Sequence, residues 1–215
     1  MKQAMSWFFV ALCMALGSAA LHAQEVGPLR LVELTVNEVV ADMNANQDVY
    51  ANDSAKLRAM VYERIVPHFN FRRMTQLAMA NHWKAATPEQ RDAISDGMLD
   101  LMVRTYANAM FTFRNTPINL VGERKTNERS AIVRLSVTNT SSGQPVDVQL
   151  RMENRNDAWQ VIDVVVGGVS MVITYRGTFA EEIRRNGIDG LVASIKSNAI
   201  EVPAEVAPAT EAPAQ

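Results

Sequence analysis

The spacing of apolar residues changes near Pro117 and again near Gly168, and these two changes restrict the fold more than any other feature. Before Pro117 and after Gly168, apolar residues recur at helical spacing. Between them, apolar and polar residues alternate, as in half-buried strands. Helices, then consecutive strands, then helices again indicate an α+β fold.

Four helices are predicted in the first part of the chain. They are expected at residues 28–43, 54–66, 71–81 and 88–112. Asp53 or Ser54 is expected to cap the second helix. Thr87, Pro88 and Gln90 have the pattern of a capping box with proline at the first helical position.

The alternating part predicts an antiparallel meander of four strands followed by two helices. The strands are expected at 118–124, 131–137, 146–152 and 159–166, with turns at 141–143 and 154–157. Gly187 is expected to separate helices at 169–185 and 188–198. Together these elements predict one domain at residues 24–200, in which helices and a four-stranded antiparallel sheet enclose an apolar cavity.

Residues 1–23 have the pattern of a secretory signal peptide. Lys2 precedes an apolar run at 7–16 that is too short to span a bilayer, and small residues follow. Cleavage is expected after Ala23, with a cut after Ala20 as the alternative. We therefore expect an exported protein.

The only cysteine, Cys13, lies inside the predicted signal peptide. Lipid attachment is not expected there, because Leu12 precedes Cys13 where a small residue would be required. Without Cys13 the chain has no thiol, so its stability must come from a packed core rather than from disulfides. Residues 201–215 are rich in Pro, Ala and Glu and predict a disordered tail.

The charge balance gives no sign of nucleic-acid binding. The chain has 21 Lys and Arg against 23 Asp and Glu, without a dense basic run. No second long apolar stretch is present, so we expect a soluble domain that binds no nucleic acid.

Residues suited to catalysis or metal binding are few. His68 and His82 have no third ligand at a metal-site spacing, and no metal is expected. Ser170 lies between a strand and a helix, as in a nucleophile elbow, but Val172 replaces the final glycine of that motif. We expect Ser170 to cap the helix instead.

Three acidic residues are candidates for acid–base groups. Glu181 and Glu182 are adjacent on a helix and are expected to be solvated. Asp163 differs, because its strand is apolar on both faces and a buried carboxylate needs a partner.

Methionine is frequent, and nine methionines follow the predicted signal peptide. Flexible thioether side chains suit a cavity that accepts ligands of variable shape. These methionines are at positions 43, 60, 74, 79, 98, 102, 110, 152 and 171. An exported domain with such an interior and no catalytic set of residues favours an apolar ligand.

An ordered set of motifs extends over about residues 26–198. The motifs are P-x-F-x-F-x-x-M at 67–74, Trp83, ATPEQR at 86–91, RTYA at 104–107, W-x-V-x-D-V-x-V at 159–166, GVS at 168–170, YR at 175–176, Phe179 and GIDGL at 187–191. In this order and spacing they resemble the MlaC family of periplasmic phospholipid-binding proteins, also known as toluene-tolerance proteins. The chain departs from the family pattern at Gly167, where Glu is usual, at Gln149, where Tyr is usual, and at Ala80, where Gly is usual.

The resemblance implies a monomeric carrier without cofactor or catalysis, whose cargo is a phospholipid. Its expected partners are an outer-membrane lipoprotein–porin complex and an inner-membrane ABC transporter with its substrate-binding subunit. Its expected role is to maintain outer-membrane lipid asymmetry. The implied fold is a cone similar to nuclear transport factor 2, with the acyl chains inside and the head group near the mouth.

Sixteen residues on the apolar faces are predicted to line the lipid site. They are Met74, Leu77, Leu101, Met102, Tyr106, Met110, Val133, Leu135, Val148, Leu150, Val164, Val166, Val169, Met171, Val172 and Tyr175. Lys84, Arg134 and Arg151 are candidate head-group or docking charges, with a solvated surface role as the alternative.

Arg176 lies within the expected apolar stripe of helix 169–185. An unpaired arginine there would be costly, so we expect an internal partner, Asp163 or another acid, in preference to the lipid phosphate. Two other functions remain open. One is an enzyme of the same fold that acts on an apolar substrate with Asp163 as base, and the other is an adaptor with a solid interior.

Overall fold

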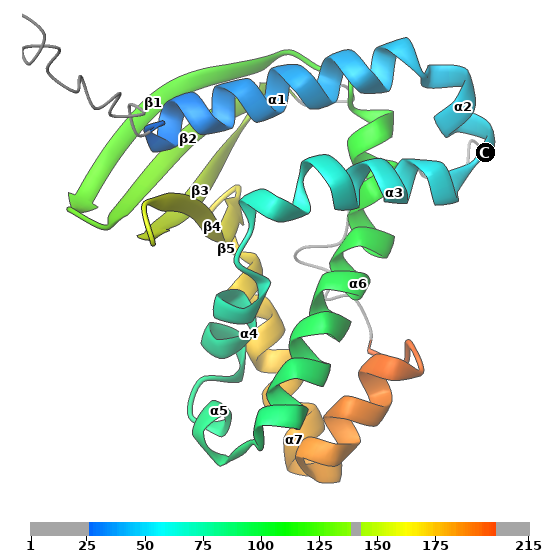
Figure 1. Ribbon diagram of the computed structural model, residues 1–215, viewed down its shortest axis with the longest axis vertical. Coiled ribbons are helices and arrows are strands. Elements are labelled where there is room, and N and C mark those ends of the chain that lie inside the picture. The colour runs from blue at the N-terminus through cyan, green and yellow to red at the C-terminus, as the bar shows by residue number, and fades with distance from the viewer. Residues whose placement is uncertain (1–25, 139–142, 201–215) are drawn as a thin grey trace, which may run out of the picture.

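A curved antiparallel sheet and a group of helices make up the structure (Figure 1). The computed structural model describes residues 26–138 and 143–200. The predicted signal peptide and the predicted tail at 201–215 lie outside these residues. Within them, the α+β prediction is confirmed.

The helices follow the predicted order. They are α1 (Pro28–Ala45), α2 (Gln47–Asn52), α3 (Ser54–Arg64), η1 (Val66–His68), α4 (Phe71–Met79), α5 (His82–Ala85), α6 (Pro88–Thr112) and α7 (Met171–Lys196). The short helices α2, η1 and α5 were not predicted, because each has too few residues to show a helical period.

Both predicted helix starts have the expected caps. At α3, the Asp53 side chain accepts hydrogen bonds from the backbone N–H groups of Ala55 and Lys56, at 3.0 and 3.1 Å. At α6, Thr87 and Gln90 form both halves of the capping box. These side chains satisfy N–H groups that have no partner within the helix.

The sheet has five antiparallel strands in the order of the sequence. They are β1 (Ile118–Asn127), β2 (Ser130–Thr138), β3 (Pro145–Arg155), β4 (Ala158–Val166) and β5 (Val169–Ser170). The four predicted strands are confirmed, and the fifth corrects the prediction that a helix starts at Val169. Gly167 and Gly168 have φ values of 57° and 87°. These values allow a two-residue hairpin turn, so the chain pairs briefly with β4 before α7 begins.

α7 has the predicted break at Gly187, where φ is 72° and ψ is −177°. The bend is fixed by Glu182, whose Oε1 accepts hydrogen bonds from Ser194 Oγ at 2.6 Å and from Asn186 Nδ2 at 2.9 Å. The two parts of α7 therefore hold each other in place across the bend.

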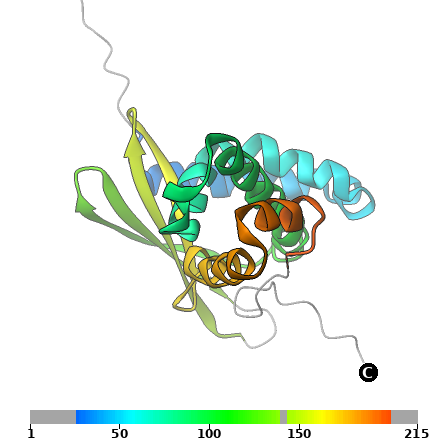
Figure 2. The same cartoon turned by 90° about the horizontal axis from the view of Figure 1, so that it is seen from below.

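Buried apolar residues form three clusters. The helical cluster joins α4, α6 and α7 and includes Met74, Met98 and Tyr175. A second cluster joins α1 to the inner face of the sheet, and a third joins α1, α3 and α6. Figure 2 shows the helical part of the molecule to one side of the sheet. α1 is therefore the helix that crosses the inner face of the sheet (Figure 1).

Candidate functional site

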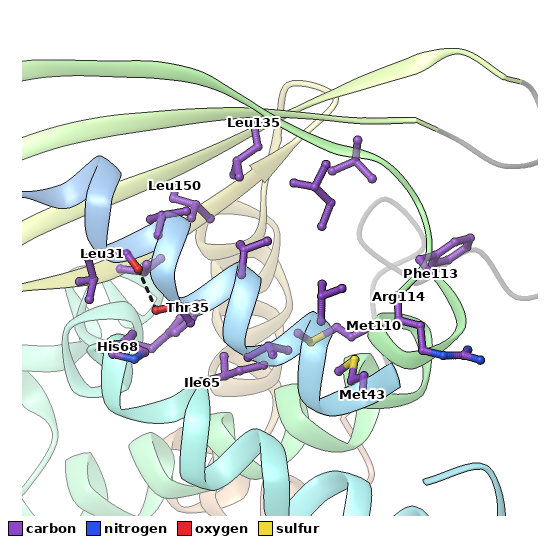
Figure 3. A pocket seen from close by; sticks show the side chains of 18 of the residues that line it. Leu31, Thr35, Met43, Ile65, His68, Met110, Phe113, Arg114, Leu135 and Leu150 are labelled. Atoms are coloured by element: carbon purple, nitrogen blue, oxygen red, sulfur yellow. Dashed lines mark hydrogen bonds between the residues drawn. The ribbon is translucent and has the colours of Figure 1, made fainter. Parts of the chain in front are cut away.

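An apolar cavity of about 280 Å³ lies between α1 and the inner face of the sheet (Figure 3). Its wall includes α1, η1, the end of α6 and four strands. The lining residues are Leu31, Val32, Thr35, Val36, Val39, Val40, Met43, Ile65, His68, Phe69, Met110, Phe113, Arg114, Ile118, Leu135, Val137, Leu150, Met152 and Val161. The prediction that sheet and helices enclose an apolar cavity is confirmed.

The sequence makes this wall apolar in two ways. Along β2, alternate residues face inward, so Leu135 and Val137 contribute to the lining. Along α1, helical spacing places Val32, Val36 and Val39 on one side. The one hydroxyl on this side, that of Thr35, donates to the carbonyl oxygen of Leu31 at 2.9 Å. The wall of α1 therefore presents almost only hydrocarbon to the cavity.

α1 is fastened near both of its ends. At the first turn, where Gly27 provides no side-chain cap, the backbone N–H of Leu29 donates to Glu123 Oε2 of β1 at 2.9 Å. Near the other end, Arg64 of α3 contacts Glu38 and lies 3.3 Å from Asp42. The middle of α1 spans the cavity between these attachments.

Three of the predicted lining residues line the cavity, namely Met110, Leu135 and Leu150. Six others are buried in the helical cluster: Met74, Leu101, Met102, Met171, Val172 and Tyr175. Four pack against that cluster: Leu77, Tyr106, Val164 and Val169. Val133 and Val148 lie in the cluster between α1 and the sheet, and Val166 is exposed. Contact of these thirteen residues with a ligand stays a prediction.

Residues of α1 supply much of the lining, although none of them was predicted as a site residue. The sequence predicts that their apolar stripe is helical but does not indicate which surface the stripe packs against. The nine methionines are also divided between the cavity lining and other parts of the structure. Met43, Met110 and Met152 line the cavity, and the others of the nine do not.

The three predicted head-group charges do not line the cavity. Arg134 pairs with Asp147 on the outer face of the sheet, with 2.9 Å between Nη2 and Oδ1. Arg151 lies 3.4 Å from Asp163, and Lys84 is exposed on α5. A docking role for these residues stays a prediction.

Asp163 is 3% exposed and has the partners that a buried carboxylate needs. It accepts a hydrogen bond from the Ser170 hydroxyl at 2.6 Å and one from the backbone N–H of Val172 at 3.1 Å. Ser170 Oγ in turn accepts from the N–H of Ile173 at 3.1 Å, which confirms the predicted cap. Asp163 and Ser170 therefore join β4 to the start of α7, and neither belongs to the cavity lining.

Arg176 is exposed, which corrects the prediction that it faces the interior with Asp163 or another acid as its partner. Its Nε and Nη2 donate to the carbonyl oxygen of Leu77 at 3.1 and 2.9 Å. The buried side of α7 follows Val172, Tyr175 and Phe179, so position 176 turns away from it. Arg176 thus links α7 to the end of α4.

Two tyrosines lie close together in the helical cluster. Burial, followed by the proximity of Tyr175, raises the pKa of the Tyr106 hydroxyl above its ordinary value. Both hydroxyls therefore stay protonated at neutral pH, and this pair adds no charge to the interior.

Two negative findings apply to residues 26–138 and 143–200. No three His, Cys, Asp or Glu side chains among them come together as a metal site. None of the helices in this part of the chain has the length and apolar character needed to cross a membrane.

Comparison with known proteins identifies the family. The family model described as MlaC protein matches residues 33–197. This chain belongs to the MlaC family. The resemblance drawn from the ordered motifs is thereby confirmed.

Two characterised relatives are similar to this chain over most of its length. The chain is 24% identical over 178 residues to the intermembrane phospholipid transport system binding protein MlaC of Haemophilus influenzae, covering 81% of this chain and 83% of that protein. It is 26% identical over 163 residues to the toluene tolerance protein ttg2D of Pseudomonas putida, covering 75% of each.

A solved structure also matches the MlaC-family fold. It is the phospholipid-binding protein from Ralstonia solanacearum in complex with a phospholipid, with a TM-score of 0.70 and 34% sequence identity. The match covers 78% of this chain and 93% of that chain.

Proposed function

We propose that this protein is a periplasmic carrier that binds the acyl chains of a phospholipid in the cavity between α1 and the sheet. The observation that carries the proposal is the hydrocarbon lining of that cavity. The Ralstonia protein with the same fold holds a phospholipid, and the Haemophilus relative is a phospholipid transport binding protein. These relatives favour a phospholipid over other apolar ligands.

Energetics explain why such a carrier needs an enclosed site. Two acyl chains contain roughly thirty methylenes, and exposing each to water costs about 0.8 kcal/mol. The total of more than ~20 kcal/mol must be largely offset at every stage of transfer. Direct transfer from membrane complex to carrier and from carrier to membrane complex meets this requirement.

The cavity must widen to hold a complete lipid. Its volume of about 280 Å³ lies at the lower end of the roughly 300–1,000 Å³ typical of ligand pockets. Because α1 is fastened near its ends, outward movement of its middle is the simplest way to enlarge the space. Closure of α1 after transfer would remove the empty, unfavourable cavity.

Carriage requires no chemical step. Asp163 is the base in the enzyme alternative. Its carboxylate already accepts hydrogen bonds from the Ser170 hydroxyl and the Val172 N–H, and it lies outside the cavity lining. We therefore favour a carrier that exchanges lipid between an outer-membrane lipoprotein–porin complex and an inner-membrane ABC transporter with its substrate-binding subunit, which maintains lipid asymmetry. A carrier only equilibrates lipid between its partners, so direction must come from those partners.

A pair of tryptophan substitutions on α1 tests the proposal. Val36→Trp fills the cavity, whereas Leu34→Trp adds the same side chain to the same helix at a position that is 44% exposed and outside the lining. Both proteins are purified from the periplasm, and their lipids are extracted and quantified by mass spectrometry. We expect the wild type and Leu34→Trp to contain phospholipid and Val36→Trp to contain about tenfold less or none.

Absence of phospholipid from gently purified wild-type protein would contradict the carrier function. Equal lipid content in both variants would contradict the assignment of the cavity. N-terminal sequencing of the same periplasmic protein tests the predicted cleavage, which should leave Gln24 as the first residue.

A further inference from the structure

Arg114 lies just after the C-terminal end of α6 and contributes to the cavity wall. Figure 3 shows its stem beside Met110 and Phe113, with the guanidinium group extending away from the cavity. The group lies over the Phe111 ring, 4.3 Å from the ring centre. Arg114 Nη1 donates to the carbonyl oxygen of Phe111 at 2.9 Å, and Nη2 lies 3.4 Å from Gln47 Oε1 of α2.

The charge of Arg114 has no acidic counterpart in the described part of the chain. The hydrogen bonds of Arg114 go to neutral acceptors, and its Nε is buried without a hydrogen-bond acceptor. Arg64, in contrast, has both Glu38 and Asp42. A half-buried guanidinium that contacts only neutral groups favours an anion.

The cavity reaches the surface near this charge. Met110 belongs to the lining and is 36% exposed. From the inside of the cavity to the surface, the apolar wall is therefore followed by the exposed Met110 and then by the Arg114 guanidinium. An amphiphile with hydrocarbon tails and an anionic head has the same order of chemical groups.

Arg114 is also the only Lys or Arg among the described residues of the lining. His68, the other basic side chain of the wall, lies on the opposite side of the view in Figure 3. Of the head-group charges predicted from the sequence, Arg134 and Arg151 already have carboxylate partners. Arg114 thus combines a position on the cavity with a charge that has no carboxylate partner among the described residues.

We propose that the Arg114 guanidinium, assisted by the side-chain amide of Gln47, binds the phosphate of the lipid head group. This inference rests on the proposed function and gives the bound lipid an orientation. The acyl chains point from the α2–α6 end of the cavity toward η1, and the head group stays at the surface beside Arg114.

Two lipids with the same tails test this inference. Lipid-free protein is titrated with dioctanoyl phosphatidic acid, which carries a phosphate, and with dioctanoylglycerol, which does not. Arg114→Met keeps an apolar stem without the charge, and Arg124→Met is the control, since Arg124 is exposed on β1 outside the lining. We expect Arg114→Met to weaken phosphatidic acid binding about tenfold and to change dioctanoylglycerol binding by less than about twofold.

Further binding measurements separate a charge effect from a loss of the apolar site. Arg114→Lys should restore most of the affinity for phosphatidic acid, because it keeps a cation at this position. Inorganic phosphate alone should not compete at millimolar concentration, because the tails provide most of the affinity. Equal weakening for both lipids, or none for phosphatidic acid, would overturn the inference while the carrier function stands. If the wild type bound neither lipid, both the inference and the proposed function would be wrong.

Discussion

Gly97 on α6 lies so close to Ile195 on α7 that a methyl group at position 97 would be 1.9 Å from Ile195 Cγ2. Real side chains do not approach to that distance, so Gly97→Ala must displace the buried Ile195 side chain or the helix that carries it. We expect the free energy of unfolding to fall by about 1–3 kcal/mol, measured by urea denaturation.

Gly177→Ala is the matched control, because no atom lies within 4 Å of its added methyl group. In the α7 helix this change should be neutral or stabilising by up to about 1 kcal/mol. In an Ile195→Ala background, the cost of Gly97→Ala should shrink. An unchanged cost would show that the contact with Ile195 is not its source.

Ala80, which ends α4, has a φ of 49° and a ψ of −119°, a conformation that favours glycine. Ala80→Gly should therefore raise the free energy of unfolding by about 1 kcal/mol. The exposed Ala59 inside α3 provides the opposite control, since Ala59→Gly should lower stability by about 1 kcal/mol. Thermal unfolding of the two variants should give shifts of opposite sign.

Asp163→Ala should be among the more destabilising polar substitutions. It leaves the Ser170 hydroxyl and the Val172 N–H without their acceptor and Arg151 without its carboxylate. We expect a loss of about 3 kcal/mol. Asp147→Ala, which breaks the more exposed pair with Arg134, should cost much less than Asp163→Ala.

The same Asp163 variant separates the carrier from the enzyme alternative. Lipid content per folded molecule should stay near that of the wild type, because Asp163 is outside the cavity lining. Loss of bound lipid from protein that remains folded would contradict a purely structural role for Asp163.

Acid should weaken the bend in α7. Hydrogen bonds first from Ser194 and then from Asn186 lower the pKa of Glu182 below its ordinary value of 4.5. The folded state therefore favours the ionised carboxylate, so this contribution to stability is fully present above about pH 4.5 and is lost as pH falls through the lowered pKa. Denaturation between pH 3 and 7 should show a shallower acid decline for Glu182→Gln than for the wild type. Parallel declines would contradict the linkage.

Local sequence patterns were sufficient for most of the elements. Thr87 and Gln90 identified the start of α6 because a capping box depends only on neighbouring residues. Gly187 was correctly placed between two helical segments, because a glycine that breaks a helical pattern is also a local signal. The two-residue β5 was missed, because two residues are too few to show the alternation of a strand.

The candidate site was less predictable, because periodicity shows that a residue is buried but not what it is buried against. Met74 and Leu101 are on apolar faces as expected, yet α4, α6 and α7 pack these faces against one another. The stripe of α1 looked equally apolar, but no local pattern indicates which helix crosses a sheet formed much later in the chain. Arg176 was misplaced for a related reason, since its partner is the Leu77 carbonyl, a backbone group that any residue provides.

The attachment of α1 to β1 has a consequence for how the protein is made. The hydrogen bond from Leu29 to Glu123 joins residues 94 positions apart, so α1 is synthesised well before the strands that cover it. Contacts between distant segments form slowly, and until they form the stripe from Val32 to Met43 faces water. The apolar wall that suits a lipid in the finished protein is therefore an aggregation-prone segment of the newly made chain until the strands cover it.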